Sequence, residues 1–426
     1  MRSRWFRLLP IMMVAFIIAF MDRTNISFAI PSMGKDLTLT ASVLGFAAGV
    51  LFLGYGLSQT IGGWIADKGH GKALIACLLI LWGLVEIAQG FIHTATELVI
   101  VRFALGLFEG GIFPAFLLFV KNWFAPSERA RANGGWQLCY PLAALLSGPI
   151  AGYILRAGDW RDLFIIEGLF PIVWAIVWVW GVADSPQNAK WLSPAERDSL
   201  VRHLEREAQN TILPTDDAPP SYWAQMARRP VVLFTIAIFF WNIGFLGFII
   251  WLPSVISQHN DLGPTETGWL SALPFAASIV VMQVLTFLSD KTGDRRVISV
   301  LALTISGLAL MLGGLTYETN SLAMNMLLLI VAGGALYGSQ PVLWSIPPDI
   351  LPTRVAATVM GTINAVGVFG GFVGPYVIGF ARSLTGSFSA GLWVMGSCLI
   401  VASLLVWRIR ESSSRRLLPV ADTRPV

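Results

Sequence analysis

Four ionisable residues lie inside stretches of the chain that are otherwise apolar. Asp22 and Arg23 interrupt the apolar run 10–30, and Arg102 and Glu109 interrupt the run 98–120. A charge near the centre of a bilayer costs at least about 2.5–3.5 kcal/mol, and ionisable residues at that depth usually mark an ion path or a substrate site. Because of this cost, we favour a functional role over an ion-pair network that only holds two helices together.

The spacing of the four residues predicts how they pair. Neighbouring residues of a helix point about 100° apart, so Asp22 and Arg23 each need a partner from another helix. Arg102 and Glu109 are two turns apart on one helical face, separated by roughly 10 Å along the axis. We therefore expect Asp22 to pair with Arg102 and Arg23 with Glu109. The buried charges would then sum to zero, which reduces the cost of burial.

Such pairs can couple a proton to an anion. Burial raises the pKa of a carboxyl group and a neighbouring arginine lowers it, so a buried pair can be poised between two protonation states. When a proton neutralises Glu109, Arg23 loses its internal partner. A carboxylate can then replace that partner, because the guanidinium fork matches two carboxylate oxygens. We assign Asp22, Glu109 and Arg102 to proton coupling and Arg23 to anion binding.

Composition sets the structural class. The 426 residues are 55% hydrophobic and only 13% charged, and the mean hydropathy is +0.68, whereas soluble domains are about 25% charged. Segments of about 20 apolar residues, long enough to cross a bilayer, recur along the whole chain. We predict an all-α polytopic membrane protein with twelve transmembrane helices, at 10–31, 43–66, 73–93, 97–121, 133–157, 163–182, 231–255, 267–289, 297–315, 323–345, 356–381 and 390–409.

The basic residues are distributed unevenly between the two faces of this predicted topology. If both termini are cytoplasmic, 23 of the 29 Lys and Arg residues lie on the cytoplasmic side. Cytoplasmic loops carry such an excess in membrane proteins, so we expect both termini inside. The basic C-terminal cluster is then a topology anchor, and we expect no nucleic-acid partner.

A polar stretch divides the chain. We predict an N-terminal six-helix half at 1–182, a cytoplasmic linker at 183–230, a C-terminal six-helix half at 231–410 and a cytoplasmic tail at 411–426. Within the linker, Ser193, Pro194 and Glu196 have the pattern of a capping box that begins a surface helix.

Two motifs recur in both halves at nearly the same offset. Asp67 and Asp290, each in a short loop after the second helix of its half, are 223 residues apart, and the Gly-Pro pairs at 148–149 and 374–375 are 226 apart. This indicates a duplicated six-helix unit. Transporters built from parallel repeats bind substrate near the bilayer midplane, between halves that rock to give alternating access.

The loop motif resembles the signature of the major facilitator superfamily. The motifs Asp22-Arg23-Thr24-Asn25-Ile26 and Arg102-Phe-Ala-Leu-Gly106-Leu-Phe-Glu109-Gly110 resemble its anion:cation symporter branch, which includes bacterial sugar-acid, tartrate and phthalate transporters. The stretch Gly370-Gly-Phe-Val-Gly-Pro375 is similar to the carboxylate-transporting members. One departure is His70, which stands where a glycine is usual.

The resemblance implies further site residues. Tyr55, Trp344 and Asn364 match positions that contact substrate in the sugar-acid transporters, and the residues we add to the substrate site are Tyr140, Asn242 and Gln340. For any single polar residue of the C-terminal half, a hydrogen bond between helices is an equally good interpretation. The loop residues Asp67, Lys68, Asp290 and Lys291 are expected to form gating contacts at the cytoplasmic face.

The predicted function is secondary active transport, namely proton-coupled symport of a small organic anion such as a sugar acid, a tartrate-like acid or an aromatic acid. The alternative is an exporter of drugs or metabolites with the same fold, since glycine-proline motifs also occur in antiporters. An enzyme is not expected, because no nucleotide loop, Ser/His/Asp set or metal-ligand cluster is present in the sequence. We expect no cofactor and no metal, a monomer, and a location in a bacterial inner membrane, with protons, an organic anion and the lipid bilayer as partners.

Overall fold

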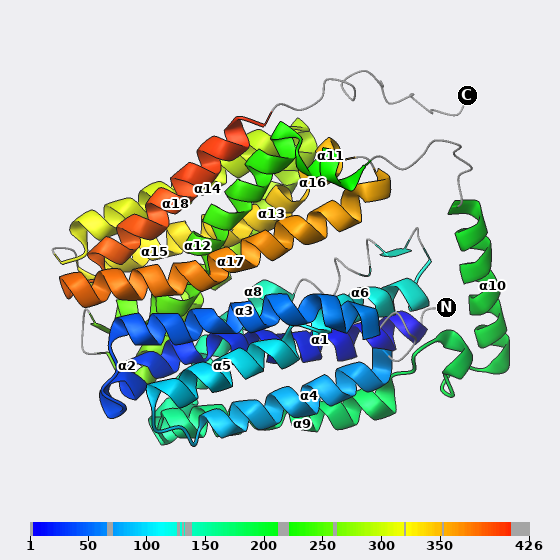
Figure 1. Ribbon diagram of the computed structural model, residues 1–426, viewed down its shortest axis with the longest axis horizontal. Helices are drawn as coiled ribbons and strands as arrows, with labels where there is room; N and C mark the ends of the chain where they lie inside the picture. Colours follow the sequence, from blue (N-terminus) through cyan, green and yellow to red (C-terminus); the bar gives the residue numbers. More distant parts are fainter. Residues whose placement is uncertain are drawn as a thin grey trace.

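The structure is a computed structural model that describes residues 3–65, 71–125, 128–129, 132, 139–211, 221–258, 262–318, 321–351 and 353–409. Within these ranges every regular element is a helix (Figure 1). The helices of the N-terminal half are α1 (Ser3–Thr24), α2 (Ile26–Asp36), α3 (Ala41–Ile65), α4 (Gly71–Gln89), α5 (Ala95–Glu109), α6 (Ile112–Trp123), α8 (Cys139–Ala157) and α9 (Trp160–Gly181).

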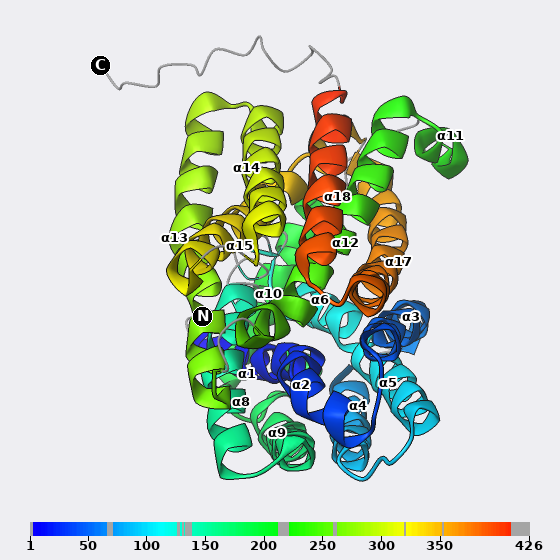
Figure 2. The same cartoon turned by 90° about the vertical axis from the view of Figure 1, so that its left-hand side faces the viewer.

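The described parts of the linker and of the C-terminal half also form helices. The linker carries the short η2 (Pro186–Asn188), α10 (Pro194–Thr211) and α11 (Tyr222–Met226). The long helices of the C-terminal half are α12 (Arg229–Gln258), α13 (Pro264–Thr292), α14 (Arg295–Thr316), α15 (Leu322–Trp344), α17 (Thr353–Thr385) and α18 (Ser389–Trp407), with the short α16 (Pro347–Ile350) before α17. The turned view in Figure 2 shows the two halves as two separate groups of helices.

The described helices agree with the predicted segments. Eleven candidate spans are long and apolar enough to cross a membrane. Two predicted segments are each broken in the middle, between α1 and α2 and between α5 and α6, where a turn replaces one or two helical residues. The fifth predicted segment corresponds to α8, whose described part begins only at Cys139 and is not among the eleven.

Local sequence signals explain where several helices begin. Ser193 and Glu196 hydrogen-bond to each other at the start of α10, so the capping box predicted from the sequence is confirmed. A second box at Thr94 begins α5, and a third at Asp159 begins α9. These caps satisfy backbone N–H groups that the first turn of a helix leaves without partners.

The two halves pack through equivalent helices. The main contacts between the halves join α3 to α17 and α8 to α13. At these crossings the backbone N–H of Ser42 donates to the Ser383 hydroxyl at 2.9 Å, and the Thr265 hydroxyl donates to the Gly152 carbonyl at 3.4 Å. Both contacts lie at the end of the bundle opposite to α10 and the start of α1 (Figure 1). The halves therefore meet closely at the end remote from the linker.

Glycine makes this close approach possible. At the α8–α13 crossing, a Cβ atom on Gly148 would overlap the carbonyl of Gly268, and a Cβ atom on Gly268 would overlap that of Gly148. The Gly-Pro motif of α17 occupies the matching position, because a Cβ atom on Gly45 of α3 would overlap the Pro375 carbonyl. The repeated motif thus marks the two places where the backbones of the halves touch.

Replacing Gly268 with alanine should separate the halves at this crossing. Overpacking costs about 1–3 kcal/mol, and the obstacle here is backbone, which cannot move aside. We expect a lower midpoint of thermal unfolding for the purified Gly268→Ala protein and reduced transport. The control is Gly361→Ala on α17, whose added Cβ would meet nothing within 4 Å. Equal midpoints for the two variants would contradict this account of the crossing.

Candidate functional site

The centre of the N-terminal half contains a buried ion pair. Arg23 donates to Glu109 Oε1 through Nε, at 2.9 Å, and through Nη2. Glu109 is 1% exposed and Arg23 is 9% exposed, so the arginine is the member nearer to open space. The pairing of Arg23 with Glu109 predicted from the sequence is therefore confirmed.

The predicted pairing of Asp22 with Arg102 is wrong. Asp22 Oδ2 accepts a hydrogen bond from the indole Nε1 of Trp82 on α4, and Oδ1 has no hydrogen-bond partner among the described residues. Arg102 reaches the carbonyl of Arg23 at 3.5 Å, while its Nε and Nη1 make no hydrogen bond within the described part of the chain. The guanidinium is attracted most strongly by Glu86, a residue of α4, and less by Asp22. The tryptophan takes the place at Asp22 that the arginine was expected to occupy.

The next two residues of the motif also have partners on other helices. The Thr24 hydroxyl lies 3.1 Å from that of Ser147 on α8. Asn25, in the turn between α1 and α2, donates through Nδ2 to Glu86 at 2.5 Å and to Glu167 at 2.9 Å. Successive residues point in directions about 100° apart, so four consecutive polar residues reach α4, α5, α8 and α9. The motif thus fixes α1 at the centre of its half.

Aromatic rings surround the exposed side of the ion pair. The Arg23 guanidinium lies over the ring of Tyr55, 4.6 Å from its centroid, an arrangement in which cation and ring attract each other. Tyr140 interacts electrostatically with Arg23 and packs edge-on against Phe16, with 4.6 Å between ring centroids, and Phe20, with 5.7 Å. The N-terminal half therefore presents one cation framed by tyrosines.

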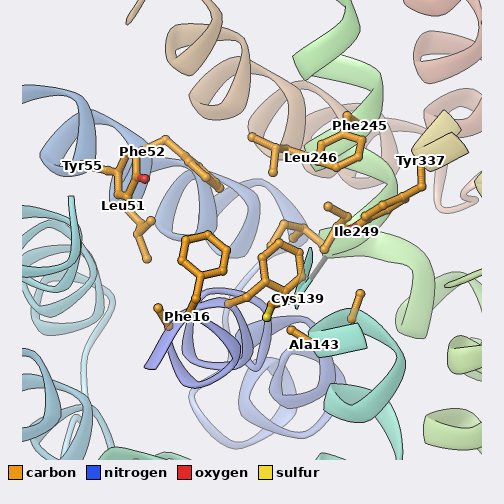
Figure 3. Packing of buried hydrophobic residues seen from close by; sticks show 14 of the residues in the cluster. Phe16, Leu51, Phe52, Tyr55, Cys139, Ala143, Phe245, Leu246, Ile249 and Tyr337 are labelled. Atoms are coloured by element: carbon orange, nitrogen blue, oxygen red, sulfur yellow. The ribbon is translucent and has the colours of Figure 1, made fainter. Parts of the chain in front are cut away.

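The C-terminal half contributes an aromatic cluster without a formal charge. Tyr337 packs against Phe245 and Phe275, with ring centroids 4.6 and 5.1 Å apart, and Trp241 stacks on Phe245 at 4.5 Å. Neither the Tyr337 hydroxyl nor the Trp241 indole N–H has a hydrogen-bond partner in the described part of the chain, although both are buried. Tyr337 interacts electrostatically with Arg23, and Figure 3 shows it with Phe245 opposite the Tyr55 and Phe16 side.

Other predicted substrate residues lie farther from this centre or are engaged elsewhere. Asn242 donates to the Ile238 carbonyl of its own helix at 3.1 Å. Trp344 packs against Phe234, two turns beyond Tyr337 along α15. Gln340 and Asn364 are half-buried on α15 and α17. The structure thus brings Arg23, Tyr55 and Tyr140 together, while a ligand role for these four residues stays a prediction.

The predicted gating residues divide into two groups. Asp67 and Lys68 lie outside the described residues. Asp290 and Lys291 are exposed near the end of α13, and among the described residues the structure records no ion pair for either. Their role as gating contacts stays a prediction. Among the described residues there is also no group of three or more His, Cys, Asp or Glu that could hold a metal ion.

Comparisons with known proteins identify the family. The model of the Major Facilitator Superfamily matches residues 12–375 and 255–422. The chain belongs to the Major Facilitator Superfamily. A putative tartrate transporter of Agrobacterium vitis is 32% identical over 423 residues, which cover 97% of this chain and 92% of that protein. A quinolone resistance transporter of Acinetobacter baumannii is 27% identical, over 97% of this chain and 96% of that protein.

Solved structures support the same fold. A bacterial homologue of the human lysosomal transporter Spinster, in an inward-facing and occupied conformation, matches with a TM-score of 0.76 at 16% identity, over 96% of this chain and 97% of that one. The family and fold predicted from the sequence are therefore confirmed. The chain is a multi-pass membrane transporter and not an enzyme.

Two acids of this facilitator were not singled out from the sequence. Glu86 and Glu167 are both 0% exposed, on α4 and α9. They carry the same signal that identified the other four charges, because each lies inside an apolar segment. The expectation that the buried charges sum to zero is therefore wrong for fully ionised groups, since the buried carboxyl groups outnumber the buried guanidinium groups around the site. Tyr337, the C-terminal residue that interacts electrostatically with Arg23, was also left out of the predicted site.

Proposed function

We propose that this facilitator is a proton-coupled symporter of a small organic anion. The observation that carries the proposal is the Arg23–Glu109 pair, a buried cation whose only ionic hydrogen-bond partner among the described residues is a carboxyl group. Such a pair can exchange its internal carboxylate for an external one. Tyr55 and Tyr337, one from each half, would then contact the bound anion.

The proposed cycle follows from charge balance. A proton that neutralises Glu109 leaves Arg23 without an ionic partner in a region where unpaired charge is costly. A substrate carboxylate restores the pair and can accept two parallel hydrogen bonds from the guanidinium group. When the substrate leaves, Arg23 returns to Glu109 and the proton is released. Proton and anion therefore bind together, because each removes the unpaired charge created by the other.

Asp22 and Arg102 assist this exchange without contacting the substrate. Arg102 donates to the carbonyl of Arg23 and thereby restricts the backbone that carries the anion-binding side chain. Asp22 accepts a hydrogen bond from Trp82, and its other carboxyl oxygen, which has no partner among the described residues, can hold a proton. We assign both residues to proton coupling and not to direct contact with substrate.

The packing of the halves supports alternating access. Close contact occurs at the end remote from the linker. If both termini are cytoplasmic, as the basic residues indicate, these contacts close the side of the protein opposite the cytoplasm, and transport would require the halves to separate at the crossings of α3 with α17 and α8 with α13. We propose a bacterial inner membrane as its location and a monomer as its working form.

We propose a tartrate-like hydroxy acid or a sugar acid as substrate, with an aromatic acid such as phthalate as the next candidate. The name of the Agrobacterium vitis relative supports the first choice. The Arg23 guanidinium can fix one carboxylate, and the aromatic rings around it suit the carbon skeleton. Small-ligand sites usually combine a few polar anchors with mostly apolar contacts in this way.

Competition with uncharged analogues tests this proposal. Uptake of labelled tartrate into proteoliposomes should be inhibited by the free acid, while its amide and alcohol analogues should inhibit poorly, because they cannot replace Glu109 at Arg23. If the amide inhibits as strongly as the acid, no carboxylate is being recognised at Arg23.

An exporter of drugs is the second candidate, favoured by the Acinetobacter baumannii relative. The two functions differ in the direction of coupling. An inward proton gradient should drive accumulation of the anion in a symporter and efflux of the cargo in an exporter. Loading proteoliposomes with a quinolone and imposing the same gradient distinguishes them.

Tyr337→Phe should weaken substrate binding and leave stability unchanged. The hydroxyl has no hydrogen-bond partner in the described structure, so its loss removes only a bond to the substrate, worth about 0.5–1.5 kcal/mol. We expect the KM for uptake to rise roughly threefold to tenfold. The control is Tyr317→Phe, whose hydroxyl donates to the Val255 carbonyl at 2.8 Å. That variant should lower the thermal midpoint and keep the KM, and the reverse pattern would exclude Tyr337 from the site.

A further inference from the structure

The N-terminal half contains a second cluster of buried polar groups besides the Arg23–Glu109 pair, formed by α4, α9 and the turn between α1 and α2. Glu86 and Glu167 both accept hydrogen bonds from Asn25 Nδ2, at 2.5 and 2.9 Å, and all three residues are fully buried. One oxygen of each carboxyl group and Asn25 Oδ1 make no hydrogen bond in the described structure. Two carboxyl groups thus face one amide, each with an oxygen that can carry a proton.

The charges of this region do not balance unless protons are bound. Arg4, which pairs with Glu128 elsewhere in the bundle, is set aside here. The other buried charged side chains of the described chain are two arginines and four acids, namely Arg23, Arg102, Asp22, Glu86, Glu109 and Glu167. Full ionisation would leave two uncompensated negative charges away from water, which is strongly unfavourable. Two of the four carboxyl groups must therefore hold protons in this conformation.

The position of Arg102 indicates where the charge can move. Its side chain is fully buried, and its Nε and Nη1 have no hydrogen-bond partner in the ranges that the structure describes. Its electrostatic attraction is strongest to Glu86, then to Glu109 and then to Asp22. Arg102 therefore interacts electrostatically both with an acid of the cluster and with the acid of the anion site. A shift of the guanidinium toward Glu86 would stabilise the ionised form of that carboxyl group and favour release of its proton.

Gln89 gives an independent indication that Glu86 can change its protonation state. It lies one turn after Glu86 on the buried face of α4, is 0% exposed, and has no hydrogen-bond partner on either amide atom in the described chain. An amide can donate to a carboxylate or accept from a protonated carboxyl group. It can therefore serve both protonation states of the neighbouring acid, whereas an apolar residue would serve neither.

We propose that Glu86, Asn25 and Glu167 form a second proton-binding site, which shares one proton between the two carboxyl groups and releases it during the transport cycle. The charged groups that act on this cluster are Asp22 on α1, Arg102 and Glu109 on α5. The site is separate from Glu109, which exchanges with the substrate. The proposal rests on the proton-coupled function proposed above and raises the number of protons carried per anion by one.

Infrared spectroscopy tests for the shared proton without any substrate. At neutral pH the purified protein should show the carbonyl absorption of a protonated buried carboxyl group. This band should be weaker in the variant with both Glu86→Gln and Glu167→Gln, because the proton of the cluster is gone, while each glutamine carbonyl can still accept from Asn25. An unchanged band in the double variant would overturn the proposal. Asn325→Leu, which removes a buried amide from the C-terminal half, should leave the band as it is.

Proton counting tests for release. With a pH-sensitive dye and labelled tartrate in the same proteoliposomes, Glu86→Gln and Glu167→Gln should each carry one proton fewer per anion, with the KM changed by less than about twofold. An unchanged ratio would show that the cluster is only structural. If wild-type protein shows no proton-driven accumulation of tartrate, the proposed function fails instead, while the infrared result still decides whether the cluster holds a proton.

Discussion

Glu109→Gln should abolish proton-driven accumulation of substrate while exchange across the membrane partly survives. The amide cannot take up or release a proton, so the step that couples the proton gradient to Arg23 is lost. It also leaves Arg23 without its ionic partner, and the substrate carboxylate becomes the only strong partner of the guanidinium group. We therefore expect tighter substrate binding together with at least a tenfold loss of accumulation in proteoliposomes.

A matched control is available on the same helix. Glu97 closes the capping box at the start of α5, and glutamine can fill that position equally well. Glu97→Gln should accumulate substrate as the wild type does. If Glu109→Gln still accumulates substrate against its gradient, Glu109 is not the coupling acid.

Asp22→Asn should resemble Glu109→Gln in accumulation, because it removes a proton-carrying group but no anion-binding cation.

Arg23→Lys should weaken substrate binding strongly although the charge is retained. An ammonium group cannot present the planar pair of donors that a carboxylate prefers, and it is too compact to keep the stacking of the guanidinium over Tyr55. The loss of one charge-assisted hydrogen bond costs about 1.5–3 kcal/mol. This corresponds to a dissociation constant roughly tenfold to a hundredfold higher, measurable by titration calorimetry with tartrate.

The same substitution at the surface serves as the control. Arg161 pairs with Asp36 at 2.5 Å where both side chains are partly exposed, and exposed pairs contribute little. Arg161→Lys should therefore bind substrate as the wild type does. Normal affinity in Arg23→Lys would place the anion on another cation, for which Arg102 is the nearest candidate.

The fold could be predicted from the sequence because its signals are local. Apolar segment length, the distribution of Lys and Arg, and two motifs repeated at nearly one offset do not depend on tertiary contacts. The interruption between α1 and α2 at Asn25 could not be predicted in this way. The hydrogen bonds of Asn25 go to residues of α4 and α9, which are far away in the sequence. The capping box at Ser193 was predictable because all of its atoms lie within four residues.

The site could be predicted only in part. The Arg23–Glu109 pair follows from helical spacing and charge, but the same reasoning failed for Asp22. A neutral donor, the Trp82 indole, satisfies that carboxyl group, and no rule of charge pairing points to a tryptophan on α4. Tyr337 was likewise indistinguishable from the other polar residues of its half. Only the packing of the two halves shows that Tyr337 interacts electrostatically with Arg23 and that its buried hydroxyl has no hydrogen-bond partner among the described residues.

The central claim is that a proton gradient drives uptake of an organic anion through the Arg23–Glu109 exchange. Its most direct test is the accumulation of labelled tartrate in proteoliposomes that contain the purified protein, with and without an inward proton gradient. We expect accumulation above the external concentration with the gradient, its collapse on addition of a protonophore, and none with Glu109→Gln. Uptake that never exceeds equilibration, or that is unaffected by the protonophore, would contradict the account.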